Sequence, residues 1–207
     1  GVEIWHELNG RSVYPVDPRH KDSYQSISKF KTFSPPTTDK QQVKAFLLRN
    51  LESACIKARR YSLAAQEVHI TLRTQDFRHF SLGAHLNRAS ANPMELAKVV
   101  DPLLDKIFQP NQFRATGVVL TKLISDDCIQ LALFSDPVRI EKFEQAARII
   151  DLINAKYGKH TLHIASSLAA DKQHTGQRGR LPERKTTLLK GETARQRLKY
   201  PMALIEV

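Results

Sequence analysis

Residues 113–134, FRATGVVLTKLISDDCIQLALF, join a long apolar segment to a short apolar peptide across an acidic turn. Residues 113–124 are rich in β-branched and apolar side chains and contain no proline, which predicts a strand in the middle of a sheet. The polar residues 125–127 end this strand. The peptide 130–134 then lies between two polar turns, which is typical of an exposed linker. The sequence therefore predicts one module before the acidic turn and another after it.

Three further segments predict strands. Residues 26–33, SISKFKTF, are a candidate first strand, which we expect Pro35 and Pro36 to end. Residues 66–74 and 79–87 alternate apolar and polar side chains, as strands with one buried and one exposed face do.

Two segments between these strands predict helices. Residues 38–61 begin at a capping residue, Thr38 or Asp39, and carry apolar side chains on one face. The second helix begins near residue 92, and its interior Pro102 predicts a kink or a restart capped by Asp101. The resulting order is β-α-β-β-α-β, an α+β fold of the ferredoxin-like class with two helices on one face of a four-stranded sheet.

The positive charge is unevenly distributed along the chain. The formal net charge is +11; residues 23–124 carry 15 basic and 7 acidic side chains, and residues 171–207 carry 9 and 4. Such placement favours binding to a polyanion such as nucleic acid, and predicts that the open face of the sheet is basic.

A second module follows the acidic turn. Residues 137–157 predict a helix, residues 161–166 a short strand, and residues 171–207 a basic, flexible tail. We therefore divide the chain into four parts: 1–22, a helix end and linker; 23–124, the sheet domain; 125–170, the apolar peptide with a helix–strand extension; and 171–207, the tail.

Several features argue against other classes of protein. Two cysteines give no disulfide framework, and no apolar run is long enough to cross a membrane, so we expect a cytoplasmic protein. Cys55 is expected to be buried and structural, and His69 and His85 lack the closely spaced partners of a metal site. Because the chain begins at Gly1 within a helix-like segment, we interpret it as a fragment of a longer protein.

Several of these segments resemble the C-terminal region of Y-family translesion DNA polymerases, in the correct order. GVEIWHELNG resembles the last helix of their thumb, SISKFKTF the first strand of their little-finger domain, and FRATGVVLTKLI its last strand. QLALF followed by RIEKFEQAARIIDLINAKYGKHTLHIAS is similar to the bacterial polymerase V catalytic-subunit type. The resemblance covers roughly residues 1–168 and implies a role in DNA repair, with SOS accessory proteins as further partners.

In that family the little finger holds the primer–template duplex mainly through its phosphate backbone, without reading sequence. Carried over by position, the resemblance implies seven DNA-binding residues: Ser26, Ser28, Lys29, Lys31, Thr71, Arg73 and Arg114.

The peptide 130–134 resembles the motif by which bacterial proteins bind the sliding clamp. Leu131, Leu133 and Phe134 would fill an apolar groove while Gln130 supplies orienting hydrogen bonds. A short core strand is the alternative interpretation of this peptide. Tethering to the clamp would raise the local concentration of a weak DNA binder.

The catalytic chemistry of the family is absent from this sequence. The palm carboxylates that hold two Mg²⁺ ions have no counterpart here, and Asp126-Asp127 reads as a solvated turn. We therefore expect no catalytic residue, metal or cofactor in this chain, although the resemblance implies a Mg²⁺-dependent DNA polymerase as the parent protein. The alternative is a stand-alone ferredoxin-like nucleic-acid-binding module, but the strands show no pair of exposed aromatics of the RNA-recognition type.

Overall fold

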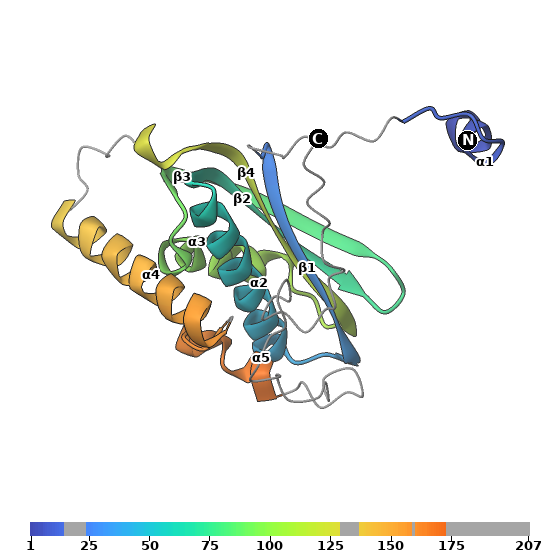
Figure 1. Ribbon diagram of the computed structural model, residues 1–207. Coiled ribbons are helices and arrows are strands. Elements are labelled where there is room, and N and C mark those ends of the chain that lie inside the picture. The colour runs from blue at the N-terminus through green and yellow to red at the C-terminus, as the bar shows by residue number, and fades with distance from the viewer. Residues whose placement is uncertain (15–23, 129–136, 159, 173–207) are drawn as a thin grey trace, which may run out of the picture.

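The computed structural model describes residues 1–14, 24–128, 137–158 and 160–172. A sheet of four strands forms the centre of the molecule, with helices α2 and α3 packed on one of its faces (Figure 1). The elements are, in chain order, α1 (Val2–Leu8), β1 (Ser26–Thr37), α2 (Lys40–Arg60), β2 (Leu63–Thr74), β3 (His79–Ser90), α3 (Pro93–Ile107), β4 (Phe113–Ser125), the 3₁₀ turn η1 (Asp126–Cys128), α4 (Pro137–Tyr157), η2 (Ala165–Ser167) and α5 (Ala169–Lys172).

The strand order in the sheet is β1-β4-β2-β3, and all three neighbouring pairs are antiparallel. β1 and β2 therefore run parallel with β4 between them, and β3 and β4 run parallel with β2 between them. These are two interleaved split β-α-β units, so the predicted fold class is confirmed. β4 is a central strand, as its apolar, proline-free sequence predicted.

The core lies between the sheet and the two helices. Asp39 caps α2 by accepting a hydrogen bond from the N–H of Gln41 at 2.8 Å, and Asn92 caps α3 in the same way through Met94. The buried apolar side chains of this core include Ile27, Phe46, Leu47, Leu51, Val68, Ile70, Leu96, Leu104, Phe113, Val118 and Leu120. Cys55 is fully buried among them, as expected.

Two predictions in the sheet domain are wrong: that Pro35 and Pro36 end the first strand and, of the two alternatives at Pro102, that the helix restarts there. β1 continues through Pro35 and Pro36, because it is an edge strand and its register with β4 shifts between Thr32 and Thr37. α3 is one uninterrupted helix across Pro102, so Asp101 caps no second helix. Its carboxylate instead accepts a hydrogen bond from Lys44 of α2 at 2.8 Å.

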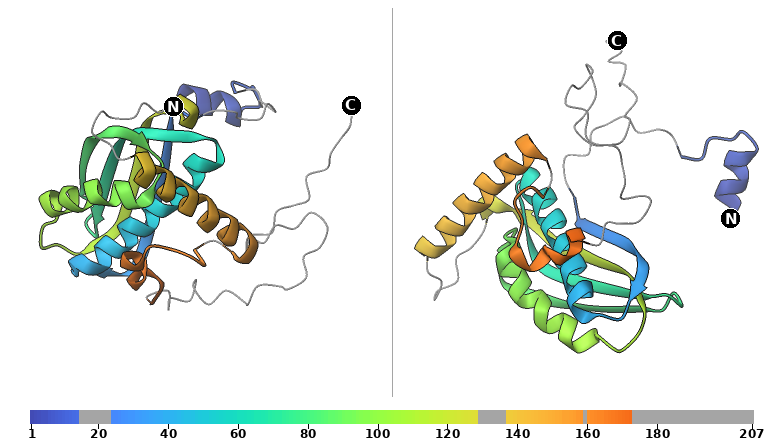
Figure 2. Two further views of the ribbon diagram at one scale, coloured as in Figure 1. Left: turned by 90° about the vertical axis from the view of Figure 1, so that its left-hand side faces the viewer. Right: turned by 90° about the horizontal axis from the view of Figure 1, so that it is seen from below.

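The C-terminal extension packs against the side of α2 that faces away from the sheet (Figures 1 and 2). Its helix α4 is confirmed, and it is anchored by Arg59 of α2, which donates two hydrogen bonds to Asp151 at 2.6 and 2.7 Å. The pair is partly buried, with exposed side-chain fractions of 17% and 27%. α2 is therefore covered on two sides, by the sheet and by the extension.

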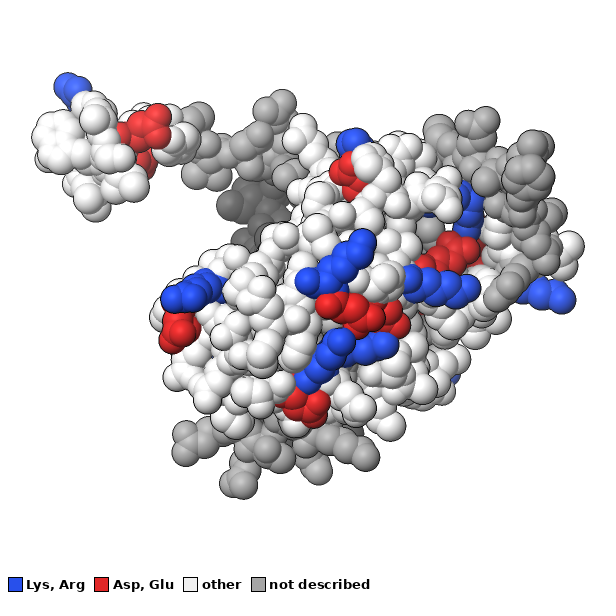
Figure 3. All heavy atoms as spheres, turned by 180° about the vertical axis from the view of Figure 1, so that it is seen from behind, with Lys and Arg blue, Asp and Glu red and all other residues white. Residues whose placement is uncertain are grey.

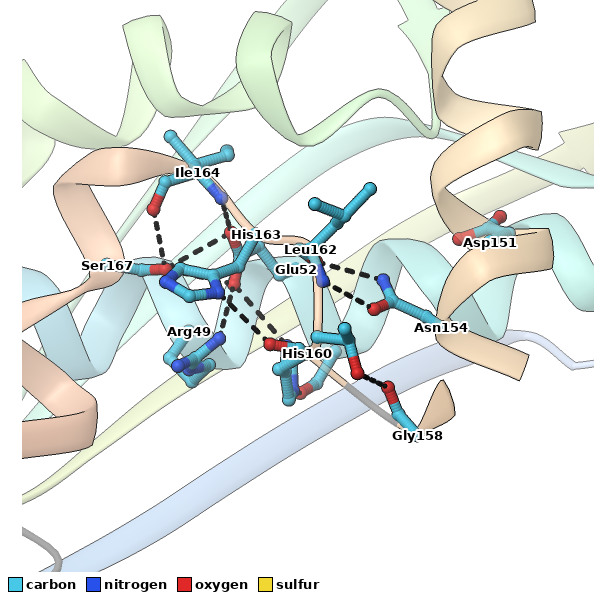
Figure 4. Close-up of polar contacts among 12 residues, drawn as sticks. Arg49, Glu52, Asp151, Asn154, Gly158, His160, Leu162, His163, Ile164 and Ser167 are labelled. Atoms are coloured by element: carbon cyan, nitrogen blue, oxygen red, sulfur yellow. Dashed lines mark hydrogen bonds and ion pairs between the residues drawn. The ribbon is translucent and has the colours of Figure 1, made fainter. Parts of the chain in front are cut away.

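The predicted strand at residues 161–166 is wrong. Asn154 of α4 binds both backbone groups of Leu162 at 2.9 Å, and Glu52 of α2 accepts the N–H of Ile164 at 2.5 Å (Figure 4). Ser167 also donates to Glu52, at 3.2 Å. Because side chains satisfy these backbone groups, the segment needs no strand partner and forms a loop followed by η2 and α5.

α1 agrees with the predicted helix end, and Gly10 adopts a φ of 78° where the helix stops. Within the described ranges, no helix is both long and apolar enough to cross a membrane.

Candidate nucleic-acid interface

The sheet face opposite α2 and α3 is not covered by either helix, and we call it the open face. Side chains alternate between the two faces along each strand, so the strand register fixes which residues share it. Thr116 of β4 marks the helix side, because Asn50 of α2 donates to its hydroxyl and its carbonyl at 2.9 and 3.0 Å. The open face then consists of four rows, each crossing β1, β4, β2 and β3: Ser26-Thr121-Glu67-His85, Ser28-Val119-His69-Gly83, Phe30-Gly117-Thr71-Ser81 and Thr32-Ala115-Arg73-His79.

The structure brings four of the predicted DNA-binding residues together on the open face. Ser26 and Ser28 lie on β1, and Thr71 and Arg73 lie on β2, in the four rows above. Their hydroxyl and guanidinium groups are the donors that commonly contact phosphate oxygens.

Lys29 and Lys31 do not lie on this face. They alternate with Ser28 and Phe30 and are in register with Val118 and Thr116, both of which are buried on the helix side. Both lysines are half-buried along the edge strand. Sequence reasoning placed serines and lysines on one surface, which the two-residue period of a strand does not allow.

Arg114 joins Arg73 at one end of the open face through an irregularity in β4. The register shifts where Arg73 pairs with Ala115 and Thr74 with Phe113, so Arg114 is the extra residue. The guanidinium carbons of Arg73 and Arg114 lie 5.6 and 5.9 Å from the ring centroid of Phe77 in the β2–β3 turn. Arg73 also donates to the hydroxyl of Thr32 at 3.3 Å. We call Arg73, Arg114 and Phe77 the hairpin cluster.

The opposite end of the open face is charge-balanced. Lys122 contacts the carboxylate of Glu67 at 2.8 Å, Thr121 donates to it at 3.1 Å, and His85 also contacts it. The hydrogen bond from Lys122 is the main reason why the pKa of Glu67 is lowered to about 2, so this carboxylate is ionised at neutral pH.

The sequence had suggested a basic open face, but the face is not uniformly basic. Its positive charge gathers in the hairpin cluster, its middle rows are rich in hydroxyls, and its far end pairs acid with base. Figure 3 shows basic and acidic side chains lying side by side on the face seen from behind. Ion pairs outside the rows of the open face include Lys40–Asp105 at 2.9 Å and Arg88–Glu95 at 2.8 Å.

Sequence reasoning missed Phe30. This side chain is 59% exposed on the open face, and its ring covers Gly117 of the neighbouring central strand. A glycine inside a β-branched strand often marks a close approach by another group, and Gly117 was the available signal. The strands themselves present no second exposed aromatic on this face, but Phe77 in the adjacent turn is 63% exposed.

Two predictions concern other groups. In the described part of the chain, no set of three or more His, Cys, Asp or Glu side chains is placed to hold a metal ion. The predicted clamp-binding residues, Gln130, Leu131, Leu133 and Phe134, lie outside the described residues.

Comparison with known proteins identifies the domain that carries the open face. Residues 24–133, more than half of the chain, match the model of the impB/mucB/samB family C-terminal domain. The chain belongs to this family. It contains the C-terminal, little-finger domain of Y-family DNA polymerases, as its strand and helix segments suggested.

Relatives of this little-finger chain include proteins named DNA polymerase IV. This chain is 24% identical to DNA polymerase IV of Clostridium acetobutylicum over 162 residues, which are 78% of this chain and 40% of that protein. It is 26% identical to DNA polymerase IV 2 of Bacillus subtilis over 174 residues, 82% of this chain and 42% of that protein. The chain thus spans about two fifths of the length of these relatives. The expected closeness to the polymerase V type is not supported.

Among solved structures, the chain is similar to the little finger domain of PolIV in a complex with the beta-clamp processivity factor. The identity is 16% and the TM-score 0.40, over 53% of this chain and 99% of that one.

Proposed function

We propose that this chain is the noncatalytic DNA-holding and clamp-binding region of a Y-family DNA polymerase that acts in translesion synthesis and DNA repair. The proposal rests on one observation above all: a domain of this family carries an uncovered sheet face, along which Ser26, Ser28, Thr71 and Arg73 lie. Arg114 adds a second guanidinium at the end of that face.

In this proposal the open face lies along the backbone of the primer–template duplex. Hydroxyls of the middle rows and the two guanidiniums of the hairpin cluster donate to phosphate oxygens, while Lys29 and Lys31 flank the face along the edge strand. Such contacts position a duplex and carry no sequence information. A polymerase that moves over any template requires contacts of this kind.

The peptide 130–134 is proposed to bind a bacterial sliding clamp. It follows β4 and η1 directly in the sequence and precedes α4, and the hydrogen bond from Arg59 to Asp151 attaches α4 to α2 of the sheet domain. In the proposal the clamp peptide is therefore connected at both ends to elements that belong to, or pack on, the DNA-holding domain. The proposed limits are 23–124 for that domain and 125–170 for the peptide with its extension.

Phosphoryl transfer is proposed for the rest of the parent polymerase, where Mg²⁺ would be held. The described residues of this chain bring no fitting ligand set together, so no catalytic step is assigned to them. A cytoplasmic location, a role in the SOS response and SOS accessory proteins as partners complete the proposal.

The test is binding to several unrelated duplexes over a series of salt concentrations, measured by fluorescence anisotropy. We expect similar affinities for all duplexes and a linear fall of log affinity with log salt, because each phosphate contact releases counterions. Salt-insensitive binding, or binding to one sequence alone, would overturn the proposal. For the clamp, Q130A/L133A/F134A is expected to abolish binding to a bacterial clamp and to leave duplex affinity unchanged.

A further inference from the structure

Phe30 is an exposed aromatic side chain on the open face, between Ser28 and Thr32 on the same side of β1. It lies on β1 in register with Gly117 of β4, and Thr71 and Ser81 continue the same row. A phenylalanine that is 59% exposed loses little contact with water on folding, so burial does not explain its place there.

The ring of Phe30 lies face-on over Gly117. A Cβ atom at Gly117 would be 2.1 Å from both Cδ1 and Cε1 of the ring and 2.9 Å from Cζ. Two adjacent ring atoms at equal distance, with the next one only slightly farther, indicate an approach through the face of the ring; an approach along its edge would leave Cζ much farther away. One face of the ring therefore covers the bare backbone of β4, and the other face is free to meet a flat ligand.

The groups around this ring suit a nucleotide. Ser28 and Thr32 flank Phe30 on the same side of β1, and the hydroxyls of Thr71 and Ser81 lie 3.2 Å apart in its row. Arg73 lies in the next row and is tied to Thr32. An exposed aromatic face beside hydroxyls and arginines is the arrangement by which proteins hold single-stranded nucleic acid, stacking bases on rings and pairing cations with phosphates.

A second aromatic lies at the end of the same face. Phe77 is exposed in the β2–β3 turn, and both guanidiniums of the hairpin cluster lie near its ring. The guanidiniums of Arg73 and Arg114 thus lie against the Phe77 ring, and Phe30 is the exposed ring on which a base can stack.

We propose that the open face binds single-stranded DNA by stacking an unpaired base on Phe30, with the phosphates on Arg73 and Arg114. The inference rests on the proposed function only in that the same face binds DNA; it adds a ligand with unpaired bases. Duplex DNA keeps its bases stacked on each other, so Phe30 contributes little to duplex affinity.

The experiment compares two single strands of about twelve nucleotides, within the range that such grooves cover. One carries bases, and the other is abasic with the same phosphates. Wild type is expected to bind the strand with bases roughly tenfold more tightly, since stacking of one base contributes about that factor. F30A and F30L are expected to bind both strands equally, because leucine keeps apolar volume without a π-face, and F30W is expected to restore the preference.

Duplex binding by the same variants separates this inference from the proposed function. We expect F30A and F30L to bind a duplex within about twofold of wild type, since phosphate contacts dominate there. The inference is overturned if F30L retains the preference for the strand with bases, or if wild type has no such preference. Failure of wild type to bind duplex would instead overturn the proposed function. Circular dichroism of each variant checks that the sheet is intact.

Discussion

The carboxylate of Glu52 in α2 accepts a hydrogen bond at 2.5 Å from the backbone N–H of Ile164, a residue 112 positions later in the chain. It also accepts from Ser167, and Arg49 and His160 lie 3.5 and 3.6 Å from it (Figure 4). Glu52 is 4% exposed. Through these buried contacts it fixes the end of the extension on the outer side of α2.

Removing this carboxylate is expected to destabilise the protein strongly. E52A removes the carboxylate that accepts the Ile164 N–H and that forms an ion pair with the buried guanidinium of Arg49, which costs about 3 kcal/mol or more. Urea unfolding measures the change in the free energy of unfolding. The matched control is E141A, which removes an exposed acid of α4 and is expected to change stability by less than about 0.5 kcal/mol. Equal stability of the two variants would contradict the anchoring role.

The lowered pKa of Glu67 predicts that the stability of the protein depends on pH in the acid range. Its pKa is lowered from 4.5 to about 2, first by the hydrogen bond from Lys122, so folding favours the ionised form. The stabilisation is fully present above the unfolded pKa and is lost as pH falls through the folded pKa. We therefore expect E67Q to have a lower Tm than wild type at neutral pH, and the difference to shrink between about pH 5 and about pH 2. A difference that stays constant over this range would contradict the assignment.

Cys55 is expected to be unreactive in the folded protein. Burial raises the pKa of its thiol to about 12, so almost no thiolate forms near neutral pH. In C128S, where Cys55 is the remaining thiol, we expect labelling by a thiol reagent to be very slow in buffer and fast in urea. Rapid labelling of the folded variant would show that the α2 core opens readily.

The contact between Gly117 and Phe30 can be tested from the glycine side. G117A adds a Cβ atom where the ring of Phe30 now lies, and the ring must move away because the backbone of β4 is held on both sides. We expect the preference for a single strand with bases to fall as in F30A, while duplex affinity stays within about twofold. In the background of F30A, where no ring remains to be displaced, G117A is expected to have no further effect on binding.

Basic residues on the two faces of the sheet are expected to differ in their contribution to duplex binding. R73A/R114A removes two cations from the open face and should lower duplex affinity and reduce the salt slope by about two, one for each phosphate contact. K29A/K31A removes the same charge from the helix side of the edge strand and should have a smaller effect on both quantities. Anisotropy over a salt series measures both variants, and a larger effect of the lysine pair would contradict the assigned interface.

Local patterns in the sequence predicted most elements, and the failures have identifiable causes. The alternation in residues 66–74 and the capping Asp39 reflect contacts within a few residues, so they could be read directly. The loop at residues 161–164 depends on Asn154 and Glu52, and the passage of β1 through Pro35 depends on its position at the sheet edge. Neither dependence can be read from a short segment of the sequence, because Glu52 and the neighbouring strand β4 lie far from these residues in the chain.

The sequence by itself determined the β-α-β-β-α-β order and the buried central strand, because period, capping and apolar content act locally, and the resemblance of its segments indicated the family. Only the tertiary structure decided which side chains share a face of the sheet. Strand register put Phe30 over Gly117 and turned Lys29 and Lys31 to the helix side, and a shift in the β2–β4 register brought Arg114 to Arg73. Register arises from pairing between residues far apart in the chain, and one step of it moves every side chain to the opposite face.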